Sequence, residues 1–152
     1  MSPFDLKAWV LAPNAQHPVV IHFPIALFIV SYAFDVLAVW RRKAALIAAA
    51  RYNLLAAAWA APVALATGLI AWQWKHEGVA LKGNLRLHLI GAVSSAVFIR
   101  TLCWLRRRGN RLDLRQSGIE TSQSPGKIYF VFGFLTMALI ILTAHIGGVV
   151  AG

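Results

Sequence analysis

The histidines of this sequence are the residues best suited to bind a metal or a cofactor. They are His17, His22, His76, His88 and His145. A neutral imidazole binds iron, copper or zinc through a ring nitrogen and can also hydrogen-bond to a quinone. Because 59% of the residues are hydrophobic and only 13% are charged, these side chains stand out against an apolar background. Any chemistry of this chain is therefore expected to depend on where its helices place the histidines.

Four apolar segments are each long enough to cross a membrane as a helix, namely residues 19–40, 53–74, 87–105 and 128–150. An α-helix rises about 1.5 Å per residue, so about 20 residues cross a hydrocarbon core of about 30 Å. The sequence therefore predicts an all-α fold, a four-transmembrane-helix antiparallel bundle, with residues 1–152 forming a single integral membrane domain. Residues 1–16 are predicted to be a short N-terminal interfacial helix and residues 106–127 a cytoplasmic loop.

The order of the segments places every histidine at one end of the bundle. When consecutive helices run antiparallel, the starts of the first and third segments lie beside the ends of the second and fourth. His17, His22 and His88 lie near those starts, and His76 and His145 lie near those ends. At about 1.5 Å per residue, His22, His88 and His145 are expected at similar depth, with His17 and His76 at the water boundary.

The basic residues gather at the opposite end. The first connection contains Arg41, Arg42, Lys43 and Arg51, and the third contains Arg106, Arg107, Arg108, Arg111, Arg115 and Lys127. By the positive-inside rule these connections are cytoplasmic, so both termini and the histidines are predicted on the periplasmic side of a bacterial inner membrane. Topology and contact with anionic lipid account for the net charge of +10, so membrane lipids and no nucleic acid are expected as partners.

Two charged residues and one thiol lie inside the predicted spans. Asp35 and Arg100 each precede the cytoplasmic end of their segment by about five residues. Because a lone charge at that depth is costly, we expect them to pair, with extension of Arg100 to the interface as the alternative. Cys103 is the single cysteine, cannot form an internal disulfide, and is expected to be a packing residue.

The sequence resembles a family of small four-helix bacterial membrane proteins catalogued as a domain of unknown function. The resemblance covers residue 16 to the C-terminus. It rests most on the HP-x3-HFP opening motif that starts at His17, and further on Leu87-His88, Thr67-Gly68-Leu69 with Trp72, and the closing His145-Ile146-Gly147-Gly148. The resemblance implies the four-helix membrane fold and no established activity.

A haem site is the interpretation that best explains the histidines. Helix bundles hold haem between histidines of facing helices, and the iron then needs little else from the protein. We expect His22 and His88 to be the ligand pair and His145 to be an alternative ligand or part of a second site. His17 and His76 are weaker candidates for metal ligation. Small residues after His88, starting with Gly91, are predicted to leave space for a porphyrin, and Arg86 is expected to pair with a haem propionate.

The functional hypothesis is a membrane b-type cytochrome-like electron-transfer subunit with haem b near the outer face. It would belong to a larger respiratory or photosynthetic complex with other membrane or periplasmic redox subunits. The absence of a CxxCH motif, a nucleophile–base pair and a phosphate loop argues against covalent haem and against an independent enzyme. The alternatives are an accessory structural subunit without a cofactor, or a histidine site for a quinone or a metal. A copper site would lack sulfur ligands near the histidines, and a hydrolytic zinc site would have only Glu77 as a nearby base.

Overall fold

The computed structural model describes residues 13–76, 81–117 and 125–151. These residues form four helices, α2 (Pro13–Arg41), α3 (Ala44–His76), α4 (Gly83–Ser117) and α5 (Lys127–Ala151). Each contains a stretch long and apolar enough to cross a membrane. The predicted all-α four-helix fold is confirmed. Most of the predicted N-terminal interfacial helix lies outside the described residues, and residues 13–16 begin α2.

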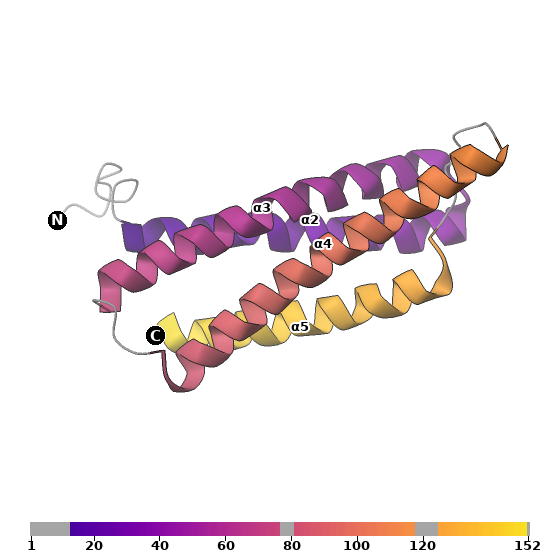
Figure 1. Cartoon of the computed structure of the whole chain (residues 1–152). Helices are drawn as coiled ribbons and strands as arrows, with labels where there is room; N and C mark the ends of the chain where they lie inside the picture. Colours follow the sequence, from indigo (N-terminus) through magenta and orange to yellow (C-terminus); the bar gives the residue numbers. More distant parts are fainter. Residues whose placement is uncertain (1–12, 77–80, 118–124, 152) are drawn as a thin grey trace, which may run out of the picture.

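Two antiparallel hairpins make up the bundle. Figure 1 shows α2 beside α3 and α4 beside α5, and α4 slants along its length from α5 toward α3. The most extensive packing is between α2 and α3, followed by α4 with α5, while α3 and α4 join the two hairpins. We call the end where α2 and α4 begin the histidine end, and the opposite end, where α3 and α5 begin, the arginine end.

The helices extend beyond the apolar segments of the sequence. Helix α3 already begins at Ala44, and α4 continues to Ser117, through much of the segment predicted as a loop. Alanine and arginine are both good helix formers, so helix continues where apolar character stops. At the arginine end, Arg42 adopts a φ of 51° and its amide donates to the Ala38 carbonyl at 2.8 Å, which ends α2.

Buried positions recur at a spacing of seven residues on every helix. On α2 this pattern includes Pro24, Ser31 and Ala38, with Phe28 and Asp35 between them. The corresponding buried positions are Ala50, Ala57 and Ala64 on α3, Ser95 and Leu102 on α4, and Tyr129, Thr136 and Thr143 on α5. A seven-residue repeat keeps one face of each helix against its neighbours in a left-handed bundle. The opposite faces are apolar and exposed, as lipid-facing surfaces are.

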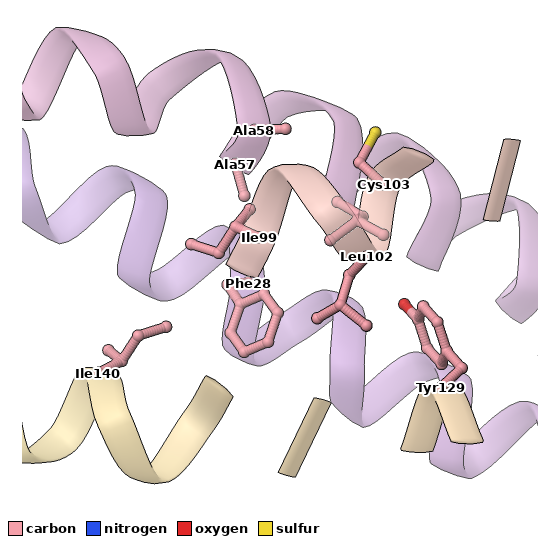
Figure 2. Packing of buried hydrophobic residues seen from close by; sticks show 9 residues of the cluster. Phe28, Ala57, Ala58, Ile99, Leu102, Cys103, Tyr129 and Ile140 are labelled. Atoms are coloured by element: carbon pink, nitrogen blue, oxygen red, sulfur yellow. The ribbon is translucent and has the colours of Figure 1, made fainter. Parts of the chain in front are cut away.

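The core combines a few large side chains with small residues of α3. Phe28, Leu54 and Leu102 are each at most 1% exposed. Figure 2 shows Ala57 and Ala58 facing Ile99 and Leu102, with Cys103 and Tyr129 in the same cluster. Small residues on α3 allow its backbone to approach α2 and α4 closely. The burial of Cys103 agrees with its expected packing role.

A buried polar network ties all four helices together near the arginine end. Arg106 Nη1 lies 2.5 Å from Asp35 Oδ2, and the Tyr129 hydroxyl donates to the same oxygen at 2.9 Å. Arg106 Nη2 donates to the Ile47 carbonyl of α3 at 3.0 Å. The predicted pairing of Asp35 with Arg100 is therefore wrong, because Arg100 instead donates to the Ala58 carbonyl at 3.3 Å.

The helical periodicity of α4 explains this correction. Ile99, Leu102 and Arg106 are all buried and share one face at spacings of three and four residues. Arg100 follows Ile99 by one residue and is exposed. Because α4 continues past Leu105, Arg106 is a core-facing helical residue and does not belong to a loop.

Candidate functional site

The histidine end contains two half-buried and two exposed imidazoles among the described side chains. His17 on α2 and His88 on α4 are half-buried, whereas His22 and His145 are exposed. His76 is the last residue of α3, and its side chain lies outside the described ones. The helices therefore bring His17 and His88 to the inward faces, and they do not turn His22 and His145 toward them.

His17 packs into a notch on α3. Its Nδ1 lies 3.1 Å from the hydroxyl oxygen of Thr67, and that hydroxyl donates its own proton to the Ala64 carbonyl at 2.9 Å. Both contacts are satisfied together when the Thr67 hydroxyl donates to the Ala64 carbonyl and accepts from the Nδ1–H of His17. The next residue is Gly68, where a Cβ atom would lie 2.8 Å from His17 Cε1. The glycine is therefore required for the imidazole to reach Thr67.

His88 packs against α5 in a related way. Its Nδ1 lies 3.0 Å from the backbone oxygen of Thr143. A carbonyl oxygen can only accept, so the Nδ1 of His88 carries the proton. A Cβ atom at Gly147 would lie 2.6 Å from His88 Cε1, so this ring too rests on a glycine of the partner helix.

The two hairpins thus hold their imidazoles through the same ring atom, Nδ1. In each hairpin the first helix supplies the histidine, and the second supplies a hydrogen-bond acceptor and a glycine. With the proton on Nδ1, the Nε2 of a neutral ring has a free lone pair, which is the form that binds a metal.

Three buried polar atoms on the helices of this half of the bundle have no hydrogen-bond partner among the described residues. They are Trp72 Nε1 of α3, Ser95 Oγ of α4 and Thr143 Oγ1 of α5. Ser95 follows His88 by seven residues on the same face, and Trp72 follows Gly68 by four. Buried polar groups are nearly always paired, so a polar partner is missing for Trp72 Nε1 and Ser95 Oγ, whereas Thr143 Oγ1 packs against Gly91.

The exposed histidines have a different environment. The ring of His22 turns back along α2, where its Nδ1 contacts the Pro18 carbonyl. His145 lies between the buried Thr143 and the half-buried Gly147 of α5 and is exposed. Ligation by His22 or His145 stays a prediction, as does ligation by His76.

Gly91, the first small residue after His88, serves helix packing. A Cβ atom at Gly91 would lie 2.4 Å from Thr143 Oγ1, so α5 fills the space in front of this glycine. The expectation that Gly91 leaves room for a porphyrin is therefore wrong. Arg86 is exposed in the first turn of α4, two residues before His88, at the rim of the histidine end.

The donor set restricts which metal centres are possible. The described part of the chain contains no group of three or more His, Cys, Asp or Glu side chains that could hold a metal ion. Zinc and copper sites need three or four protein ligands, whereas a porphyrin supplies four nitrogens and leaves only the axial positions to the protein. Two imidazoles are too few for such a zinc or copper site, and they equal the number of axial positions of a haem iron.

Comparison with known protein families assigns the chain to one of them. A family model described as "Predicted membrane protein (DUF2231)" matches residues 13–151. The chain belongs to this family. The match covers all four helices and confirms the resemblance to a membrane protein family of unknown function. No curated protein and no solved structure gives a significant match. DUF2231 membership therefore supports a membrane protein, and its activity has to be argued from the site.

A signal for His17 is present in the sequence. His17 precedes Pro24 by seven residues and Ser31 by fourteen, so it continues the buried face of α2. Polar residues such as Ser31 and Asp35 within an apolar helix mark its inward face, because they are costly in lipid. When that face is extended toward the N-terminus, it includes His17 and not His22. The depth of a residue along the helix does not show which face it lies on.

Proposed function

We propose that this chain is a b-type cytochrome-like electron-transfer subunit with a haem at its histidine end, ligated by His17 and His88. The observation that carries the proposal is that both rings are held through Nδ1 by the partner helix, an arrangement that leaves Nε2 for a ligand. His88 was expected as a ligand from the sequence. His17 takes the place of the exposed His22 because it lies on the inward face of α2.

This arrangement argues against a quinone as the main ligand. A quinone carbonyl needs a hydrogen-bond donor, but the single proton of neutral His88 is already donated to the Thr143 carbonyl, and His17 would donate its own to Thr67 in the same arrangement. A metal needs the opposite, an unprotonated Nε2 held in a fixed direction. The hydrogen bonds of His17 and His88 supply this.

Each residue of the site has a defined task in this proposal. Thr67 and the Thr143 carbonyl orient the rings, and Gly68 and Gly147 give them room. Haem iron, when bound, supplies one-electron transfer. The haem would lie between the hairpins, because one ligand comes from each, and Arg86 at the rim would pair with a propionate. Redox subunits of a larger membrane complex would be its partners.

We infer that the arginine end faces the cytoplasm of a bacterium and the histidine end the periplasm. More of the described basic side chains lie at the arginine end than at the histidine end. Those at the arginine end are Arg41, Arg42, Lys43, Arg106, Arg107, Arg108 and Lys127, and those at the histidine end are Lys82 and Arg86. Lysine and arginine near span ends favour the cytoplasmic side. Electron transfer would then take place near the outer face.

Visible absorption spectra of the purified protein, oxidised and reduced with dithionite, test the proposal. The wild type should show a low-spin b-type spectrum, which His17→Ala and His88→Ala should abolish or convert to high spin. His22→Ala is the matched control, because His22 lies on the same helix and is exposed. A wild type that is purified folded and takes up no haem would favour an accessory subunit without cofactor. Loss of haem in His22→Ala with retention in His17→Ala would restore the pair expected from the sequence.

A further inference from the structure

A groove opens on the outer surface of α3 and α4, away from the histidines. Its volume is about 490 Å³, within the range of roughly 300–1,000 Å³ common for small-molecule sites. It is lined by Leu55, Ala58 and Trp59 of α3 and by Val97, Arg100, Thr101, Cys103, Trp104 and Arg107 of α4. These residues lie in the half of the bundle nearer the arginine end.

The charge of the groove is positive and unbalanced. Arg100 and Arg107 both line it, and they lie seven residues apart on one face of α4. Asp35 is the one carboxylate among the described side chains, and it is buried against Arg106. Within the described part of the chain, the groove therefore presents two guanidinium groups and no acidic counterpart.

Arg100 lies deep in the membrane span. It precedes Arg107 by seven residues, or about 10 Å along the helix. Its described hydrogen bond is to the Ala58 carbonyl at 3.3 Å, which uses one of five possible donors. A charged side chain at this depth is costly unless it faces water or an opposite charge. An anion in the groove would supply that charge.

The remaining groove surface suits a lipid molecule. Trp104 is 54% exposed, and the guanidinium of Arg108 lies 5.3 Å from its ring centre, as expected for an aromatic residue at the headgroup level. Trp59 is 68% exposed and, with Val97 and Leu55, forms an apolar wall at the depth of Arg100. A phosphate beside arginines and an acyl chain along an apolar wall together describe a phospholipid.

We propose that this groove binds an anionic phospholipid from the membrane leaflet at the arginine end. Arg107 at the rim and Arg100 below it hold the phosphate, and one acyl chain lies along Trp59 and Val97. Basic pockets between transmembrane helices on the cytoplasmic side are known to bind anionic headgroups. The site is independent of the haem proposal, because none of its residues contacts the histidine end.

Lipid retention measures the site directly. The detergent-purified protein is mixed with equal amounts of phosphatidylglycerol and phosphatidylcholine, and the bound lipid is identified by native mass spectrometry. The wild type should retain phosphatidylglycerol preferentially. Arg100→Gln and Arg107→Gln should each lower that preference by about fivefold, the effect of one basic residue near anionic lipid. Arg107 lies at the exposed rim, so its variant keeps the test valid if Arg100→Gln fails to fold.

Lys43→Gln is the matched control, because Lys43 is an exposed cation at the same end and does not line the groove. It should leave the preference unchanged. An equal loss in Lys43→Gln would reduce the effect to general surface charge and overturn the proposal. A wild-type protein that retains both lipids equally would also overturn it. A change of oligomeric mass in Arg107→Gln without a change in lipid retention would also contradict the lipid proposal. It would show that a second copy of the chain covers the groove.

Discussion

Asp35 of α2 and Arg106 of α4 form a buried ion pair that joins the two hairpins. Their side chains are 0% and 6% exposed, and Tyr129 of α5 donates to the same carboxylate oxygen. The second oxygen, Asp35 Oδ1, has no hydrogen-bond partner among the described residues. Because the pair lies away from solvent, the two charges depend on each other, and removing one leaves the other uncompensated.

Replacing one member of this pair should strongly destabilise the protein. We expect Asp35→Asn or Arg106→Gln to cost about 3–5 kcal/mol of unfolding free energy, because a buried charge loses its partner. Unfolding in detergent, followed by circular dichroism, measures the change. Lys43→Gln should stay within about 0.5 kcal/mol, because Lys43 is exposed and does not line the groove.

The double variant Asp35→Leu with Arg106→Met separates pairing from packing. If mutual compensation is the main role of the pair, the double variant should be more stable than either single variant, since apolar replacements of buried pairs are often neutral or stabilising. Additive losses would instead show that each residue contributes separately, for example through the bond from Arg106 to the Ile47 carbonyl.

The glycines beside the imidazoles should be intolerant of a methyl group. At Gly147 a Cβ atom would lie 2.6 Å from His88 Cε1, so Gly147→Ala must displace the ring or separate α4 from α5. We expect a lower melting temperature, with a loss of about 1–3 kcal/mol from overpacking. Gly148→Ala is the control, because no atom lies within 4 Å of its Cβ position. Equal melting temperatures for the two variants would contradict the packing of His88 on α5.

The acceptor for His17 should control cofactor binding. Thr67→Val removes the hydroxyl that accepts from Nδ1 while keeping the side-chain volume, so the imidazole loses its fixed orientation. On the proposed function, haem affinity should fall by about 10–100-fold, as is common when the partner of a metal-ligating histidine is lost. Haem titration of the apoprotein gives the value. Thr67→Ser should restore most of the affinity. Wild-type haem affinity in Thr67→Val would contradict ligation by His17.

The charge distribution predicts which end is cytoplasmic. Fusions after Gly152 should be active with a reporter that works only in the periplasm. Fusions within residues 109–126, at the end of α4 and in its connection to α5, should be active with a reporter that works only in the cytoplasm. The opposite pattern would place the histidines at the cytoplasmic face and exclude electron transfer near the outer surface.

Much of the fold follows from the sequence because helix formation and membrane crossing are local properties. Four apolar segments of sufficient length predict four helices, and their antiparallel order brings the start of α2 beside the end of α3. The seven-residue recurrence of Pro24, Ser31 and Ala38 also lies in the sequence, and it identifies His17 as an inward residue. Helix ends are less well predicted, because hydropathy detects only the part of a helix that lies in lipid.

The partners of the inward side chains were decided only by the tertiary structure. Asp35 pairs with Arg106 and not Arg100 because of how far α4 continues as a helix and which of its faces meets α2. Likewise, the proton of His88 is placed by the Thr143 carbonyl, more than fifty residues away, and the ring can reach it because Gly147 has no side chain. Such contacts depend on the distance and rotation between packed helices, which no single segment specifies.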